Sequence, residues 1–447
     1  MFLIKGEYMK RLVLSLVCIS ALLFLAGESV SAGGSGETSK GPVKLSVWGG
    51  FPEMEAYYKY AAEEYKKVKP NVEVTVLTHP LREFEQKLSA TIPSDTAADI
   101  IEISMYANQK FIEAGLIPEL PAKVKDFFSV SGRYSDFAKA NNTYKGKFYG
   151  LPIFQGRTAL FWNKKMFQEA GLSGPPKTFA EMAEYAKKLA KYDGGGTLTR
   201  SGHSLRISGQ GSGVAEKFWF VLYPMGGTVI EEGKEKGKYH AGYANDAGRK
   251  ALKYYIDALY ADKWDNHSMK HDADAFELEM TAMFFRESWV IGDIAKKAPN
   301  LSYDTATVPS DSRWARITNP VNLYVTRSSK NQEAAWDFAM FLNDPKNLLW
   351  LLDNVGWLPV RQDIDLSPVI AKKPQMKAFA LNDPKYMEFG YVGIAPFDEI
   401  MTKLAERLVS AYLDKSLADN PAALAKTIEA AANETNEILK KAKLYSE

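Results

Sequence analysis

Apolar runs and amphipathic stretches alternate along residues 43–115, and this alternation constrains the fold more than any other feature of the chain. Strands are predicted at 43–48, 71–77 and 99–104, and helices at 52–68, 81–92 and 106–114. Repeated strand–helix units predict an α/β fold with a mostly parallel sheet and helices on both faces. Ligands bind such sheets beyond the carboxyl ends of the strands. We therefore expect a binding site near residues 48–50, 79–83 and 104–108.

A second α/β region follows. The β-branched and aromatic run 158–162 predicts a buried strand, and Thr178 with Glu181 forms the sequence pattern of a helix capping box. Further strands are predicted at 205–208, 303–308 and 322–326. Further helices are predicted at 213–223, 245–259, 273–284, 331–342, 344–355, 396–412 and 421–441.

The N-terminus has the features of an export signal. Two basic residues, Lys10 and Arg11, precede the apolar run 12–25, and small residues follow it. This order predicts a signal peptide over 1–32, with translation starting at Met1 or Met9. Residues 33–42 predict a flexible polar leader. Glu28 stands where a lipoprotein signal needs cysteine, so we expect a periplasmic or extracellular protein without a lipid anchor.

Charge and cysteine content exclude several classes of protein. The 56 basic and 54 acidic residues nearly cancel, which gives no reason to expect nucleic-acid binding. Cys18 is the only cysteine and lies within the predicted signal peptide, so we expect no disulfide and no thiol nucleophile. His267 and His271 have the spacing of a helical metal site, but a solvated polar stretch explains them better, and no metal or cofactor is expected.

Several stretches carry a resemblance to a known family. The block GLPIFQGRTALFWNK at 150–164, followed by a helix, Gly171 and TFAEMAEYAKKLAK, matches a pattern of that family. Further matching stretches, in family order, are VWGG, AEEYKKVKPNVEV, FIEAGLIPEL, AMFFRESWVIGDIAKKAPN and EAAWDFAMFLNDPKNLLWLLDNVGWLPVR. The chain resembles the family 1 extracellular solute-binding proteins of ABC sugar importers, which are maltose-binding-protein-like.

This resemblance implies a two-lobe periplasmic-binding-protein fold with discontinuous lobes joined by three hinge crossings. The crossings are placed near 154–157, 319–324 and 357–361. The implied N-terminal lobe is 43–155 with 325–357, and the implied C-terminal lobe is 157–320 with 360–447. A carbohydrate between the lobes, ABC permease membrane subunits as partners, a monomer and no catalytic residue are implied as well.

Candidate ligand-binding residues come from strand ends, from the crossings and from the family pattern. Trp48 ends the first strand, and Trp289 stands where the family has a tryptophan that stacks on sugar. Charged and polar side chains would bind hydroxyl groups. The full set is Trp48, Glu53, Arg82, Ser104, Tyr106, Gln155, Arg157, Glu216, Trp219, Arg286, Trp289, Asn322 and Asp398. The competing interpretation is core packing for the tryptophans and surface ion pairs for the charged residues.

Two other functions are compatible with the residues. An exported glycoside hydrolase needs two carboxylates across a bond, and Glu53, Glu287 and Asp398 are available. A binding protein for a non-sugar solute such as a polyamine needs acidic groups in its cleft. Nucleotide binding is disfavoured, because Val214 breaks the glycine pattern that follows Gly209 and no Walker A sequence is present.

Overall fold

The computed structural model describes residues 41–447, which include one compact unit, Pro42–Glu447. The predicted signal peptide and nearly all of the predicted leader lie outside the described residues. The strands are β1 (Val43–Gly49), β2 (Val72–Thr78), β3 (Ile100–Ser104), β4 (Thr143–Tyr144), β5 (Lys147–Phe148), β6 (Leu151–Asn163), β7 (Lys191–Tyr192), β8 (Leu198–Arg200), β9 (Ile230–Glu232), β10 (Tyr239–Ala241), β11 (Met283–Glu287), β12 (Tyr303–Ala306), β13 (Ala315–Val325), β14 (Leu358–Pro359) and β15 (Met387–Phe389).

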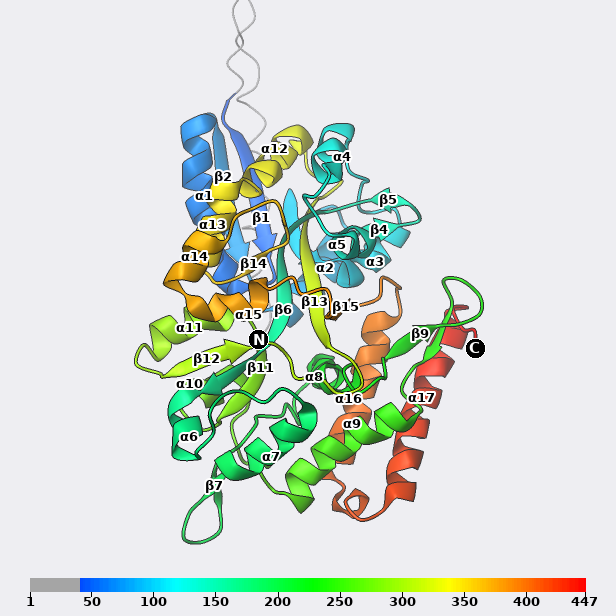
Figure 1. Cartoon of the computed structure of the whole chain (residues 1–447). Helices are drawn as coiled ribbons and strands as arrows, with labels where there is room; N and C mark the ends of the chain where they lie inside the picture. Colours follow the sequence, from blue (N-terminus) through cyan, green and yellow to red (C-terminus); the bar gives the residue numbers. More distant parts are fainter. Residues whose placement is uncertain (1–40) are drawn as a thin grey trace, which may run out of the picture. The chain divides into compact units, whose positions relative to one another are not determined.

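The helices alternate with these strands over most of the unit (Figure 1). They are α1 (Glu55–Val68), α2 (Leu81–Thr91), α3 (Met105–Glu113), α4 (Ala122–Ser129), α5 (Asp136–Asn141), α6 (Lys164–Glu169), α7 (Phe179–Leu189), α8 (Gly213–Leu222), α9 (Asp246–Ile256), α10 (Asp272–Glu277), α11 (Trp289–Lys297), α12 (Gln332–Leu342), α13 (Pro345–Asn354), α14 (Ser367–Lys372), α15 (Lys377–Ala380), α16 (Phe397–Leu413) and α17 (Pro421–Lys441). No helix within residues 41–447 is both long enough and apolar enough to cross a membrane.

The main sheet has the strand order β11-β6-β13-β3-β1-β2. β1 pairs in parallel with both β2 and β3, as the alternation predicts. β13 runs antiparallel to β3 and β6, and β11, β12 and β14 run antiparallel to β6. The expectation of a mostly parallel sheet is therefore correct for the first three strands and wrong for the sheet as a whole. The long strands β6 and β13 cause the difference. β6 pairs antiparallel with all four of its partners, and β13 pairs antiparallel with β3 and β6 and in parallel with β15.

The three predicted crossing segments lie side by side in this sheet. Gln155 of β6 is opposite Pro320 of β13 and also opposite Leu358 of β14. β6 is buried along nearly its whole length, including its polar residues Gln155, Arg157 and Thr158. Figure 1 shows β6 and β13 next to each other in the middle of the unit.

Local sequence signals explain where several elements begin and end. The Thr178 hydroxyl accepts a hydrogen bond from the backbone N–H of Glu181 at 3.1 Å, so the predicted cap of α7 is confirmed. The Asn163 side chain likewise accepts from the backbone N–H of Met166 at 3.0 Å and starts α6. Gly171 then follows α6 with a φ of 69°, a left-handed conformation that glycine adopts without strain.

Two secondary-structure predictions are wrong, the strand at 205–208 and the full length of the helix at 273–284. Residues 205–208 form no strand, because the backbone N–H of Leu205 bonds to the buried Asp265 carboxylate instead of to a neighbouring strand. The predicted helix 273–284 ends early, with α10 stopping at Glu277. Glu279 adopts a φ of 56°, and the backbone N–H of Met280 bonds back to Ala275, which closes the helix end. The chain then enters β11, which carries Arg286 and Glu287.

Candidate functional site

A cavity of about 350 Å³ lies beyond the carboxyl ends of β1 and β3. This position agrees with the rule for ligand sites in α/β sheets, and the volume is in the range of small-molecule sites. The residues that line it are Gly50, Phe51, Pro52, Glu53, Leu81, Arg82, Ser104, Tyr106, Gly156, Arg206, Gln210, Gly213, Glu216, Arg286, Glu287, Trp289, Asn319, Val321, Trp357 and Tyr391.

Aromatic rings form much of the cavity wall. Trp357 is one of these rings, and its centroid lies 5.6 Å from that of Phe51 and 6.5 Å from that of Trp289. Elsewhere in the lining, Tyr106 and Tyr391 stack with centroids 4.1 Å apart. Trp357 is buried, whereas Trp289 is only half-buried and lies between two hydrophobic clusters. Trp289 is therefore the tryptophan whose ring can gain most contact from a bound molecule.

Glu53 brings a carboxylate to the same wall. Its Oε1 atom accepts a hydrogen bond from the indole N–H of Trp357 at 3.0 Å. Burial raises the pKa of Glu53 above its ordinary value of 4.5, although hydrogen bonds from its own backbone and from Trp357 oppose that shift. No ion pair within 4 Å holds this carboxylate in the described part of the chain, so it can accept hydrogen bonds from a ligand.

A buried network of four charges forms another part of the wall. Glu287 lies 3.6 Å from the Lys217 ammonium and 3.3 Å from an Arg286 nitrogen, and it accepts a hydrogen bond from Trp289 at 3.4 Å. Arg286 also pairs with Asp272 at 2.8 Å. Burial disfavours ionisation of Glu287, but Lys217 and Arg286 outweigh that effect and lower its pKa well below the usual range. These charges neutralise one another and fix the position of Trp289.

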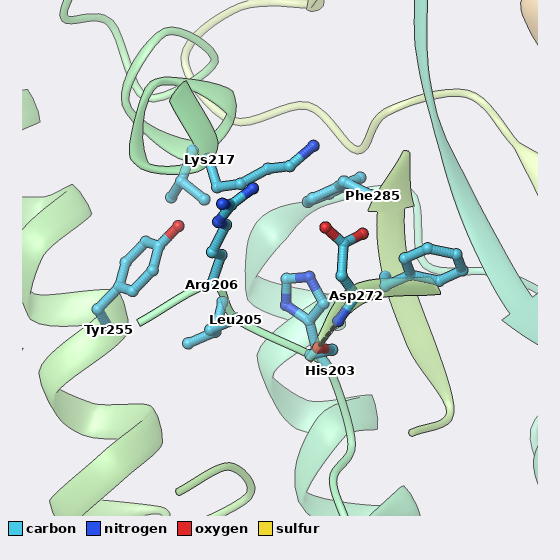
Figure 2. Close-up of a pocket in the computed structure, with 10 residues that line it drawn as sticks. His203, Leu205, Arg206, Lys217, Tyr255, Asp272 and Phe285 are labelled. Atoms are coloured by element: carbon cyan, nitrogen blue, oxygen red, sulfur yellow. Dashed lines mark hydrogen bonds between the residues drawn. The ribbon is translucent and has the colours of Figure 1, made fainter. Parts of the chain in front are cut away.

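Arg206 differs from this network, because its guanidinium has no ion pair among residues 41–447. It comes from the irregular segment after Leu205 and reaches both the main cavity and a smaller one beside Lys217 and Asp272 (Figure 2). A Cβ on Gly213 would lie 2.6 Å from the Arg206 guanidinium carbon, so this close approach depends on glycine at 213. Arg206 thus supplies a free hydrogen-bond donor to the cavity.

The structure brings seven of the thirteen predicted site residues to this cavity. They are Glu53, Arg82, Ser104, Tyr106, Glu216, Arg286 and Trp289. Several lining residues were not predicted, and the most informative of them are Phe51, Arg206, Asn319, Trp357 and Tyr391. Trp357 and Asn319 lie within the predicted crossing segments, so their position in the sequence was a signal that could have identified them as site residues. Nothing in the sequence distinguishes Arg206.

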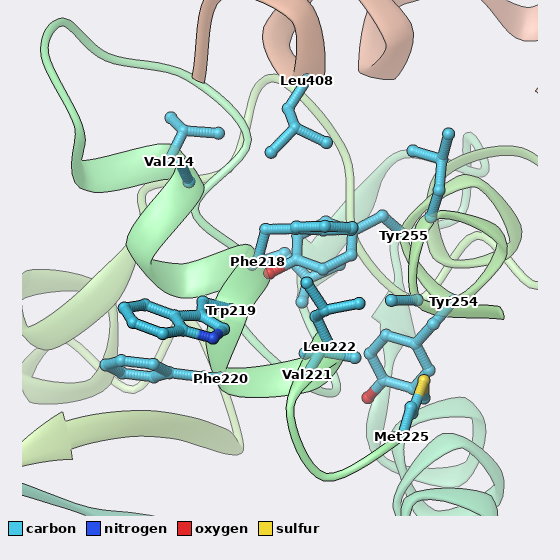
Figure 3. Packing of buried hydrophobic residues seen from close by; sticks show 14 of the residues in the cluster. Val214, Phe218, Trp219, Phe220, Val221, Leu222, Met225, Tyr254, Tyr255 and Leu408 are labelled. Carbon is cyan, nitrogen blue, oxygen red and sulfur yellow. The ribbon is translucent and has the colours of Figure 1, made fainter. Parts of the chain in front are cut away.

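Three predicted residues pack away from the cavity, Trp219 and Asn322 fully buried and Trp48 half-buried. Trp219 is 2% exposed and packs against Phe389 with centroids 5.1 Å apart, on the helix whose packing Figure 3 shows. Trp48 packs against a different cluster, and its ring lies 4.0 Å from the Lys87 ammonium. Asn322 is fully buried, with its amide donating to the Tyr324 hydroxyl at 3.0 Å. None of the three lines the cavity.

The alternation of side chains along β6 explains two further placements. Gly156 faces the cavity, so its neighbours Gln155 and Arg157 point to the other face of the sheet, where both line a separate cavity. There Arg157 pairs with Glu388 at 2.5 Å. Asp398, at the start of α16, lies outside the main cavity and 3.6 Å from Arg82.

Comparison with known proteins decides the family. Residues 60–378 match the model of the bacterial extracellular solute-binding proteins. The chain belongs to this family. A galactooligosaccharide-binding protein of Bacillus subtilis is 24% identical over 383 residues, which cover 83% of this chain and 85% of the relative. A binding protein of Brucella abortus is also 24% identical, over 93% of this chain and 98% of its own length.

Solved structures show the same fold. An ABC transporter solute-binding protein of Thermotoga lettingae, bound with α-D-tagatose, superposes with a TM-score of 0.75 at 21% identity and covers 89% of this chain and 100% of its own. A substrate-binding protein of Listeria monocytogenes, in complex with cycloalternan, has a TM-score of 0.76 at 17% identity and covers 89% and 99%. This solute-binding protein therefore has the two-lobe periplasmic-binding-protein fold. Its family consists of exported binding proteins and not of enzymes.

Proposed function

We propose that this solute-binding protein captures a carbohydrate in the cavity of about 350 Å³ and delivers it to the membrane subunits of an ABC permease. The observation that carries the proposal is the combination of a half-buried Trp289 with free polar groups at Glu53 and Arg206. Aromatic faces cover the C–H surfaces of sugar rings, while carboxylates and guanidinium groups bind hydroxyl groups in defined directions. The galactooligosaccharide-binding relative and the tagatose-bound structural neighbour support the same class of ligand.

The lobes and the hinge belong to the same proposal. We assign 43–155 with 325–357 to the N-terminal lobe and 157–320 with 360–447 to the C-terminal lobe, with the cavity between them. The side-by-side register of β6, β13 and β14 supports crossings at these positions. A ligand that contacts both Glu53 and Trp289 binds the closed arrangement more tightly, and this difference in affinity drives closure. We expect a monomer in the periplasm or outside the cell.

A thermal-shift screen tests the proposed ligand class. Galacto-, malto- and chito-oligosaccharides, free hexoses and tagatose should be compared with spermidine and putrescine. A ligand present at 100 times its Kd stabilises the native protein by about 2.7 kcal/mol, so at least one saccharide should raise the melting temperature clearly. A shift with a polyamine and with no saccharide would instead assign the free carboxylates Glu53 and Glu216 to a cationic ligand.

The proposal predicts a pH-dependent affinity. As the pH falls through the raised pKa of Glu53, its carboxylate gains a proton and loses acceptor capacity, so saccharide affinity should fall with it. A hydrogen bond to a charged group contributes about 1.5–3 kcal/mol, which predicts roughly a tenfold loss or more between neutral and acid pH. Calorimetric titrations at several pH values measure the loss. Glu53→Gln should bind more weakly at neutral pH and show a flatter pH profile, and an unchanged profile in this variant would argue against the role of Glu53.

A further inference from the structure

A second cavity of about 430 Å³ adjoins the first. Arg82 and Tyr106 line both of them. The loop before α8 also touches both, since Gln210 and Gly213 line the first cavity and Gly211 lines the second. The remaining walls of the second cavity come from α2, α3 and α16. The two spaces are thus neighbouring compartments that have the Arg82 side chain in common.

Arg82 spans this boundary by contacting three different segments. One of its nitrogens lies 2.6 Å from Glu85 on its own helix and 3.6 Å from Asp398 on α16. Another donates a hydrogen bond to the Ser212 hydroxyl in the loop before α8. The loop fits closely against the arginine, because a Cβ on Gly211 would lie 3.3 Å from Arg82 Nε. The guanidinium is thus held between α2, α16 and the loop before α8, where Arg82 lines both compartments, although 41% of the side chain remains exposed.

The second compartment has polar groups of its own. Glu85 Oε1 is buried and has no hydrogen-bond partner in the described part of the chain, and Asp398 Oδ1 has only its ion pair with Arg82 at 3.6 Å. Hydroxyl, amide and ammonium groups from Ser89, Gln86, Lys110 and Thr402 line the same space, together with the ring of Phe111. Hydroxyl, amide and ammonium groups are the kinds of side chain that hydrogen-bond sugar hydroxyls. Polar side chains and an aromatic ring of this lining can therefore face a second sugar unit.

We propose that the second compartment is an additional saccharide subsite and that Arg82 is the partition that limits how far a ligand extends into it. This inference rests on the proposed function. With Arg82 in place, a ligand that fills the first compartment extends only partly into the second. Removal of the side chain joins the compartments and admits a longer saccharide. Arg82 is accordingly a specificity-determining residue for ligand length.

The test compares the length preference of the wild-type protein with that of Arg82→Ala. Calorimetric titration with malto-, galacto- and chito-oligosaccharides of one to six units gives the affinity for each length. We expect Arg82→Ala to change the ratio of long-chain to short-chain affinity by about tenfold or more in favour of long chains. Thr402→Trp added to Arg82→Ala refills the second compartment and should reverse that gain. Melting curves of each variant establish that it is folded.

Asp398→Asn is the matched control for a purely structural role. It weakens the contact between Arg82 and α16 but leaves the arginine in the passage. If Arg82 only held the two segments together, both Arg82→Ala and Asp398→Asn would change the affinity for every length by the same factor, and this outcome would overturn the inference while leaving saccharide binding intact. Absence of binding to every saccharide by both the wild-type protein and Arg82→Ala would overturn the proposed function and the inference together.

Discussion

Replacement of Trp289 by alanine is expected to weaken saccharide binding by roughly 30-fold or more. Aromatic anchors of this kind typically cost about 2 kcal/mol or more when truncated, and each 1.4 kcal/mol corresponds to about a tenfold change in affinity. The ring is half-buried in the free protein and lines the cavity, so a sugar face can cover its remaining surface. Calorimetric titration of Trp289→Ala with the best ligand from the thermal-shift screen measures the loss.

Two other tryptophans provide matched controls. Trp48 is also half-buried but lies outside the cavity, so Trp48→Ala should leave the affinity unchanged. Trp336 is buried in the core on α12, and its removal should cost about 3–5 kcal/mol of stability. A Trp289→Ala protein that loses that much stability and keeps its affinity would show that Trp289 is a core residue.

Replacement of Glu287 by glutamine is expected to destabilise the protein by about 3 kcal/mol or more. The substitution keeps the shape of the side chain but removes the charge that compensates the buried Lys217 ammonium. Breaking a buried ion pair by removing one partner typically costs 3–5 kcal/mol, because the other charge is left without compensation. Urea unfolding monitored by fluorescence measures the change in the free energy of unfolding.

The double variant Lys217→Met/Glu287→Gln separates this explanation from simple packing damage. Loss of both charges should restore much of the stability, whereas additive losses in the double variant would contradict the charge explanation.

The destabilisation by Glu287→Gln also has a defined pH dependence. The pKa of Glu287 is lowered in the folded protein, so its contribution is present above the ordinary value of 4.5 and is lost as the pH falls below it. The difference between the wild-type protein and Glu287→Gln should therefore shrink in acid.

The sequence predicted most of the architecture, because hydrophobic period and capping residues are local. The first three strands, the cap at Thr178 and the helices of the C-terminal third all follow such signals. The direction of strand pairing does not follow from local signals, because it depends on how β6 and β13 run through the sheet. The early end of α10 at Glu277 was missed for a similar reason, because the following residues prefer the strand pairing of β11 to a continued helix.

The site was predicted less completely, because a strand-end position does not determine which way a side chain faces. Trp48 ends the first strand as expected, but it packs against a core cluster while Phe51, three residues later, reaches the cavity. Gln155 and Arg157 lie in the correct segment and point away from the cavity, on either side of Gly156. Arg206 comes from an irregular segment held by Asp265, a contact between residues far apart in the chain.

The shared ladder of β6, β13 and β14 has a mechanical consequence. The three segments proposed as crossings pair with one another at Gln155, Pro320 and Leu358, so none of them could rotate independently of the other two. Any rotation of the parts on either side must be absorbed as a change in twist distributed over several paired residues. A change in twist of this kind keeps the backbone hydrogen bonds between the strands and bends the strands only slightly at each residue. Opening and closing of the proposed lobes would then be elastic and quickly reversible. The bound ligand would only shift the equilibrium between more open and more closed arrangements.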